Sequence, residues 1–206
     1  MVGINSMNFQ KLFIDTNDYY RLAHIWWGDE SVQFHGYIEG YKKGADALVE
    51  KAITSNNISI LDTLVYPALF LYRQFLELQI KRIILLDSEK THDEKKDVIN
   101  IVGHNLKKAW EEVKTSINDC FDEGDNSIAE IEELILEFHQ FDEASLNFRY
   151  PVRKKDLQVA FHNCKRFDLQ VVKDQMDRIE EFFFDVNEVL LANQESAAED
   201  MREFFD

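Results

Sequence analysis

The first candidates for chemistry are polar side chains on an otherwise apolar segment, residues 58–88. They are Arg73, Gln74, Glu77 and Lys81. In a helix these four side chains fall within an arc of about 100°. Buried charges are costly unless they pair, so such an arc is expected to meet a cleft, a partner chain or a matching polar group. The alternative is an ordinary i, i+4 network on a partly exposed edge, and the sequence leaves both open.

A histidine and an asparagine, His104 and Asn105, precede an apolar stripe that starts at Leu106. A histidine at a helix N-terminus feels the positive end of the helix dipole. That favours the neutral imidazole and suits an acid, a base or a hydrogen-bonding role. The competing interpretation is a helix cap, in which one of the two side chains accepts hydrogen bonds from free backbone amides.

Charge is distributed unevenly along the chain. Six basic residues and one acid lie between positions 149 and 166, whereas positions 119–143 hold ten acids and no lysine or arginine. The six basic residues are Arg149, Arg153, Lys154, Lys155, Lys165 and Arg166. We interpret the acidic stretch as solvated surface. The whole chain has a net charge of −16, which repels nucleic acid, so we expect RNA binding to be weak and confined to the basic segment.

Motifs for metals, cofactors and common hydrolytic reactions are missing from the sequence. It has no glycine-rich phosphate loop, no Cys-x-x-Cys, no His-Glu-x-x-His and no Gly-x-Ser-x-Gly. Glu89-x-x-His92 occurs once, in a charged stretch, whereas a di-iron bundle needs two such units. We therefore expect no metal and no cofactor.

The cellular location is inferred from what the sequence lacks. Cys120 and Cys164 have no paired spacing, the N-terminus has no secretory-signal pattern, and no apolar run reaches membrane-spanning length. We therefore expect a cytoplasmic protein without a membrane partner.

Apolar residues recur at steps of three and four, which predicts an all-α fold, a helical bundle of about five to six helices. We expect a single domain, residues 1–206, with a charged turn at 89–96, an irregular connection at 143–165 and an acidic tail at 193–206. The expected helices are 30–55, 58–88, one from Leu106, one from Ser127, and a long closing helix from Leu169 to about residue 190.

The sequence also predicts how three of these helices bury their apolar side chains. The first helix should bury Phe34, Tyr37, Tyr41, Ala45, Leu48 and Ala52. The segment 58–88 is apolar nearly all round and should be the central helix, with Pro67 either opening its main part or kinking it. In the closing helix, Phe182, Phe183 and Phe184 are consecutive, and one helix cannot turn all three into one core. This run is our reason to expect a symmetric homodimer.

Three of these segments, taken in order, resemble the HEPN superfamily of small bacterial and archaeal helical domains. The matching patterns are Gln74-x-x-Glu77-x-x-x-Lys81, His104-Asn105-Leu106 and Arg149-Tyr150-Pro151. The HEPN-like core would cover about residues 58–192, preceded by an N-terminal extension and helix, residues 1–57. The resemblance implies a helical bundle that dimerises, with its functional groove at the dimer face.

Many proteins of this superfamily are metal-independent ribonucleases in toxin–antitoxin or phage-defence systems, and others pair with a nucleotidyltransferase. Ribonuclease members carry an Arg-(four to six residues)-His pattern, in which the arginine stabilises the phosphorane charge and the histidine moves the proton. Here the nearest spacings are Arg153 to His162 and Arg149 to His162, which are longer. The resemblance therefore makes Arg149, His104 and His162 the catalytic candidates.

Two functions from different classes remain open on the sequence. One is a non-catalytic or divergent protein that acts by dimerisation and by binding a partner or a nucleotide in a defence or stress system. The other is a metal-independent endoribonuclease. The binding candidates for both are Arg73, Glu77, Lys81, Asn105, Tyr150 and Arg153, and the partner expected from the resemblance is a nucleotidyltransferase or an antitoxin.

Overall fold

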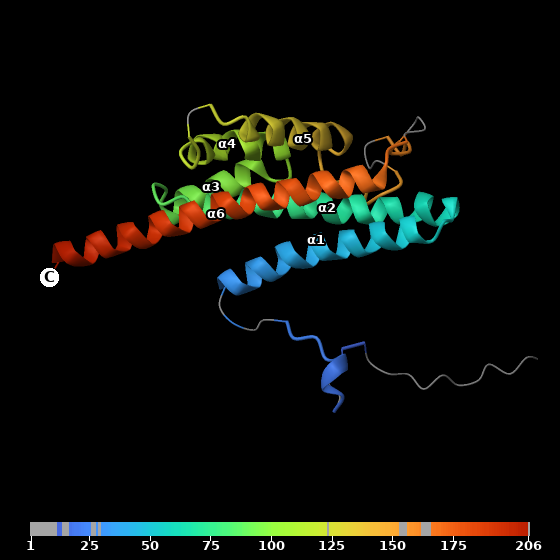
Figure 1. Cartoon of the computed structure of the whole chain (residues 1–206), viewed down its shortest axis with the longest axis horizontal. Helices are drawn as coiled ribbons and strands as arrows, with labels where there is room; N and C mark the ends of the chain where they lie inside the picture. The colour runs from blue at the N-terminus through green and yellow to red at the C-terminus, as the bar shows by residue number, and fades with distance from the viewer. Residues whose placement is uncertain are drawn as a thin grey trace, which may run out of the picture. The chain divides into compact units, whose positions relative to one another are not determined.

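The computed structural model describes residues 12–13, 17–25, 28, 30–122, 124–152, 156–161 and 166–205. Within the helices, side chains are described for residues 32–196. The structure contains six α-helices and one short 3₁₀ helix in the described part of the chain (Figure 1). The helices are α1 (Glu30–Thr54), α2 (Ile58–Leu86), α3 (His92–Val102), α4 (Leu106–Asn118), α5 (Ser127–Phe141) and α6 (Leu169–Phe205). The described residues form no strand, so the predicted all-α fold is confirmed.

The chain forms two compact units, residues 1–34 and residues 35–206. In the described part of the first unit, a 3₁₀ turn at Tyr19–Arg21 precedes the start of α1. The second unit holds the remainder of α1 and all the other helices. None of the described helices combines the length and the apolar character needed to cross a membrane.

Helix α2 is the central helix of the larger unit, as its composition predicted. At 100° per residue its buried positions span an arc of about 200°, and the opposite face, which includes Leu71, Leu78 and Leu85, is half-buried or exposed. Helices α3, α4 and α6 pack against α2. Its apolar buried residues are Ala68, Leu69, Tyr72, Phe75, Leu76, Ile80, Ile83 and Ile84. The helix is continuous through Pro67, so of the two predicted alternatives the proline does not open the main part of the helix.

The buried face of α1 differs from the predicted one. Its buried positions are Ile38, Lys42, Ala45, Val49 and Ala52, whereas Tyr37 is 54% exposed. The predicted stripe omitted Ile38, Lys42 and Val49, which are buried. The spacing of the buried set is nonetheless the steps of three and four that an amphipathic helix requires.

Helix α3 lies where a charged turn was predicted, and this expectation was wrong. Its N-terminus carries a capping box: the Thr91 side chain accepts from the Glu94 amide, and the Glu94 carboxylate accepts from the Thr91 amide. The two bonds satisfy backbone groups that a helix end otherwise leaves free. The spacing Thr-x-x-Glu was the signal in the sequence, hidden among the charges.

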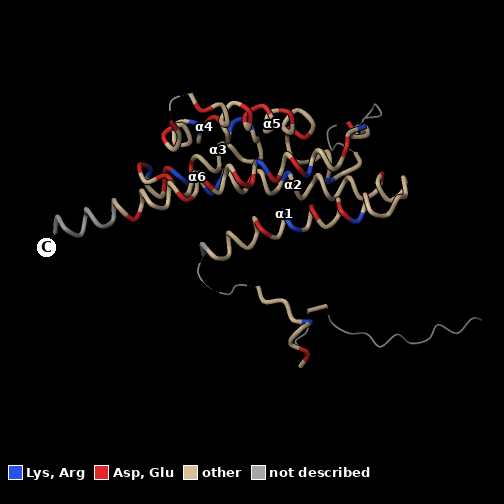
Figure 2. Tube along the Cα trace, in the orientation of Figure 1, with Lys and Arg blue, Asp and Glu red and all other residues tan. Residues whose placement is uncertain are grey.

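The two following helices agree with the predicted positions. Helix α4 buries Leu106, Trp110, Val113 and Ile117, the predicted stripe, and α5 begins at Ser127. Acidic side chains recur along α5 (Figure 2). Two of them form ion pairs with neighbouring helices, Glu132 with Lys114 and Glu130 with Arg178. The acidic helix is therefore partly fixed by basic partners and not only solvated.

Helix α6 is longer than predicted, because the segment expected as a tail continues it to Phe205. Gln194, within this continuation, donates to the carbonyl oxygen of Leu86 at the end of α2. Phe182 and Phe183 are buried beside Trp110, whereas Phe184 is 62% exposed. The expectation that three consecutive phenylalanines cannot enter one core is confirmed for this helix.

Candidate functional site

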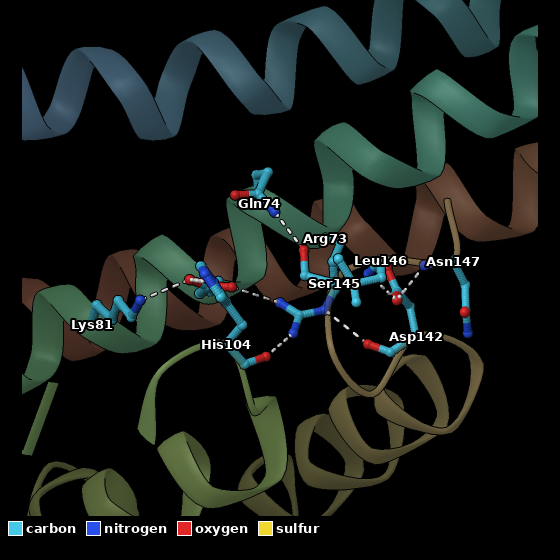
Figure 3. Close-up of polar contacts among 9 residues, drawn as sticks. Arg73, Gln74, Lys81, His104, Asp142, Ser145, Leu146 and Asn147 are labelled. Carbon is cyan, nitrogen blue, oxygen red and sulfur yellow. Dashed lines mark hydrogen bonds and ion pairs between the residues drawn. The ribbon is translucent and has the colours of Figure 1, made fainter. Parts of the chain in front are cut away.

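Three charged side chains of α2 lie together on one face, at successive turns of the helix (Figure 3). An Nη1 atom of Arg73 donates to Glu77 Oε2 at 3.2 Å, and Lys81 Nζ donates to Glu77 Oε1 at 2.7 Å. The predicted i, i+4 network therefore exists. It lies in the interior rather than on an exposed edge, because the side chains of Arg73 and Glu77 are 0% and 6% exposed.

The Arg73 guanidinium is held entirely by groups of its own chain. Besides Glu77, its Nη2 donates to the carbonyl oxygen of His104 and its Nε donates to that of Asp142, at 3.4 Å. All three nitrogens therefore have partners on α2, on the turn between α3 and α4, and on the connection after α5. A buried arginine needs such partners, because an unpaired buried charge is strongly destabilising.

The turn between α3 and α4 presents two groups of His104 to α2. Gly103 ends α3 with φ +52°, a left-handed conformation that a side chain would strain. Asn105 then caps α4, with its side-chain oxygen accepting from the Lys108 amide at 2.9 Å. Of the two predicted caps, Asn105 fills that role, which leaves His104 free to contact Glu77.

The imidazole of His104 is paired with the buried carboxylate of Glu77. His104 Nδ1 lies 2.9 Å from Glu77 Oε1, while the histidine side chain is 61% exposed. An ionised carboxylate only accepts hydrogen bonds, so Nδ1 carries the proton of this contact. In the neutral ring Nε2 then holds a lone pair, and such a nitrogen is able to take a proton from a bound molecule.

The connection after α5 closes the other side of the cluster. Gln74 donates to the hydroxyl of Ser145 at 2.8 Å. The Asp142 carboxylate accepts from the amides of Leu146 and Asn147, at 2.7 and 2.9 Å, which folds this connection back onto α2 (Figure 3). Sequence reasoning missed Asp142 and Ser145. An aspartate that ends a helix and precedes serine and asparagine favours such a turn and was the available signal.

Opposing effects set the protonation of the cluster. Burial alone would raise the pKa of Glu77, but Lys81, Arg73 and His104 more than offset it and hold the pKa below its ordinary value. Burial lowers the pKa of Arg73, against the attraction of Glu77 and Asp142. An arginine nevertheless stays protonated in proteins. Arg73 and Glu77 are thus both charged at neutral pH.

Other predicted site residues do not join this cluster. Arg149 and Tyr150 are exposed, and the Arg149 guanidinium lies 4.9 Å from the centre of the Tyr150 ring. No hydrogen bond or ion pair among the described residues joins Arg149 to the cluster, so the expectation that it reaches Arg73 was wrong. Arg153 and His162 lie outside the described residues, as do Lys154, Lys155 and Lys165. Arg166 is exposed.

A second buried charge, missed from the sequence, joins α1 to the bundle. Lys42 is 2% exposed and pairs with Asp46 at 2.8 Å and with Asp177 of α6 at 2.5 Å. Asp46 also accepts from the hydroxyl of Tyr72 on α2. Burial alone would lower the pKa of Lys42, but Asp177, Asp46 and Glu180 raise it to about 12. This network is structural, because its lysine is enclosed and fully engaged.

An apolar cavity of about 270 Å³ lies between α2, α5 and α6. Its walls include Leu69, Phe138, Phe148, Phe167 and Met176. None of the residues proposed for chemistry from the sequence lines it, so it is separate from the Arg73 cluster. Within the described part of the chain, no group of three or more His, Cys, Asp or Glu side chains has the arrangement of a metal site.

Comparison with known proteins gives no further assignment. No protein-family model, no curated protein and no solved structure matches this chain. The function therefore has to be argued from the site itself.

We predict that Glu77→Ala lowers the free energy of unfolding by about 3 kcal/mol, because it leaves Arg73 and Lys81 without their shared carboxylate. The matched control is His104→Ala, which removes a mostly exposed ring but keeps the carbonyl oxygen that Arg73 uses. It should cost under about 1 kcal/mol. Urea unfolding of both variants measures the difference. A loss below about 0.5 kcal/mol for Glu77→Ala would show that solvent replaces the carboxylate.

We also predict that the stability contributed by Glu77 disappears in acid. Its pKa is lowered on folding, so the contribution is complete above the ordinary pKa of about 4.5 and is lost as the pH falls through the lower folded-state value. The difference in unfolding free energy between the wild type and Glu77→Gln should therefore shrink from pH 6 towards pH 3. Urea titrations at several pH values test this, and a constant difference would contradict it.

Proposed function

We propose that this chain is a HEPN-like helical protein, a non-catalytic or divergent member that acts by dimerisation and by binding a partner or a nucleotide in a defence or stress system. The observation that carries the proposal is the state of Arg73. Its guanidinium is fully buried, and each of its nitrogens donates to a group of its own chain. An arginine held in this way organises the bundle and has no donor directed at a substrate.

Ribonuclease members of the superfamily need an arginine that can reach the scissile phosphate beside the histidine. Among the described residues, the arginine that contacts His104 is Arg73, which solvent does not reach. Arg149 is accessible but has no bond to the cluster. The arrangement thus favours a structural role for this polar pattern over RNA cleavage.

A second candidate function, metal-independent endoribonuclease activity, has one specific observation in its favour. The Glu77 carboxylate holds an exposed imidazole with Nε2 available to accept a proton. Lys81, which is 16% exposed and pairs with the same carboxylate, is the cation that could balance the charge of a phosphorane. The reaction would be proton transfer from a ribose 2′-hydroxyl to His104, after which the 2′-oxygen bonds to the adjacent phosphorus. The bond from phosphorus to the 5′-oxygen breaks, and the leaving 5′-oxygen takes a proton from solvent.

The surface suits a protein partner of basic character. The net charge of −16 and the acids along α5 attract a positively charged surface and repel RNA. The partner classes that the resemblance suggests are a nucleotidyltransferase and an antitoxin. For self-association, the exposed Phe184 is the apolar group that α6 cannot place in its own core.

We predict that the full chain is a dimer at micromolar concentration, so static light scattering should give twice the monomer mass of 24.3 kDa. Phe184→Ser should move the mass towards the monomer without loss of helix content, because this ring is exposed in the single chain. Circular dichroism provides the control for folding. A wild type that scatters only as the monomer would contradict the dimer.

We predict no RNA cleavage in the presence of EDTA. We also predict that RNA binding is weak and falls steeply with salt, because at most six basic residues can contact RNA phosphates while the net charge of the protein, −16, repels RNA. The assay compares the wild type with His104→Ala, Arg149→Ala and His162→Ala. Arg178→Ala, which removes an exposed arginine of α6, is the matched control. Cleavage that survives EDTA and Arg178→Ala but disappears in the other variants would establish the ribonuclease instead.

A further inference from the structure

The apolar cavity between α2, α5 and α6, about 270 Å³ in volume, takes no part in the functions considered above. Helix α6 packs against both α2 and α5 (Figure 1). The inner wall is buried, because Leu69 of α2 and Met176 and Ile179 of α6 are at most 4% exposed. Glu137 and Asp168 also line the cavity and are exposed. The cavity therefore has an apolar interior and meets solvent on the side of these two residues.

Aromatic rings form much of the wall. Leu134, Phe138 and Phe141 recur at steps of four and three, so they lie on one face of α5. Phe148 and Phe167 come from the connection between α5 and α6. The rings of Phe138 and Phe148 meet edge to face with centroids 5.9 Å apart, and those of Phe141 and Phe167 do so at 6.3 Å. Four phenylalanines from two segments thus surround one space.

Neither packing nor water accounts for this space. Protein interiors are packed closely, and an empty apolar cavity lowers stability because its walls lose contacts. Water is a poor occupant, because apolar walls offer it no hydrogen-bond partners. A dry cavity of about 150 Å³ lined by Leu, Ile and Phe is large enough to bind benzene. The larger volume here is sufficient for one benzene ring with a short substituent.

The composition of the wall selects the chemical class of the occupant. Phenylalanine rings favour a further aromatic ring, packed edge to face or offset, over an aliphatic group of equal area. The sulfur of Met176 also makes favourable contacts with aromatic rings. Among the described residues, Glu137 and Asp168 line the cavity but no Lys, Arg or His does, so an anion is repelled. A cation would lose its hydration in the apolar interior. The favoured occupant is therefore aromatic and uncharged.

We propose that this cavity is a binding site for a small, uncharged molecule with a single aromatic ring. The ring lies among the four phenylalanines and against Met176, and its substituent points to the solvent side. The site is independent of the proposed HEPN-like function, because no residue of the cavity wall belongs to the Arg73 cluster or contacts His104.

The experiment is isothermal titration calorimetry of the full chain with 2-phenylethanol, a benzene ring that carries a short alcohol. Val172→Trp on α6 and Leu134→Trp on α5 place an indole in the cavity from half-buried positions. Each should weaken binding by about tenfold or more, because the indole and the ligand cannot occupy the same volume. The matched control is Val98→Trp, the same change at a half-buried position of α3 outside the cavity, which should leave the affinity unchanged. Circular dichroism checks that each variant keeps its helix content.

Two further ligands test the chemical class. 2-Cyclohexylethanol has a ring of similar size without aromatic character, and it should bind about threefold to tenfold more weakly than 2-phenylethanol. Phenylacetate keeps the benzene ring but is an anion, and it should bind more weakly by about tenfold or more. Glu137→Gln removes one of the two repelling charges and should reduce this second difference.

Three results would overturn the proposal. Equal affinity for 2-phenylethanol and 2-cyclohexylethanol would show that the cavity does not select an aromatic ring. Unchanged affinity in both Val172→Trp and Leu134→Trp would place the ligand elsewhere. If 2-phenylethanol gave the wild type neither heat of binding nor a rise in Tm, the cavity would not be a binding site for this class. None of these results depends on whether the chain dimerises or cleaves RNA.

Discussion

The larger unit is organised around one buried charge, the guanidinium of Arg73. A guanidinium without solvent requires acceptors, and it finds them in Glu77 on its own helix, in the carbonyl oxygen of His104 and in that of Asp142. These groups come from three segments that are far apart in the sequence. The central helix is otherwise apolar, so this charge fixes where the α3–α4 turn and the connection after α5 have to lie. Apolar packing alone sets no such register.

The same contacts divide the polar residues into two classes. Those that satisfy Arg73 are enclosed and are committed to the structure, whereas the His104 ring is held at its edge by Glu77 and remains exposed. A residue pattern that suggests catalysis in the sequence is therefore compatible with a structural role, and burial decides between them. The Lys42 network repeats this arrangement on another face of α2, where Tyr72 and two aspartates surround a lysine.

Periodicity was sufficient to predict the helices that bury an apolar stripe, and the buried face of α4, which starts at Leu106, agrees with it. It was insufficient at two places. The capping box of α3 was hidden because the helix is short and highly charged, and the face of α1 was displaced because Lys42 is a buried charge. Within the site, Arg73, Glu77 and Lys81 could be predicted because local helix geometry brings them together. The sequence could not predict that Arg73 contacts Asp142 and not Arg149. This contact depends on the path of the irregular connection after α5.

The pair of Lys42 and Asp177 has a consequence for how the chain is made. The two residues are 135 positions apart, and the first lies on α1 and the second on α6. During synthesis α1 leaves the ribosome long before Asp177 of α6 has been made. Until then Lys42 lacks this ion pair. Closing so long a loop is entropically costly and slow compared with forming a local helix. The earliest of the six described helices thus gains its ion pair with α6 only after the last helix has been synthesised, whereas its hydrogen bond from Tyr72 of α2 can form earlier.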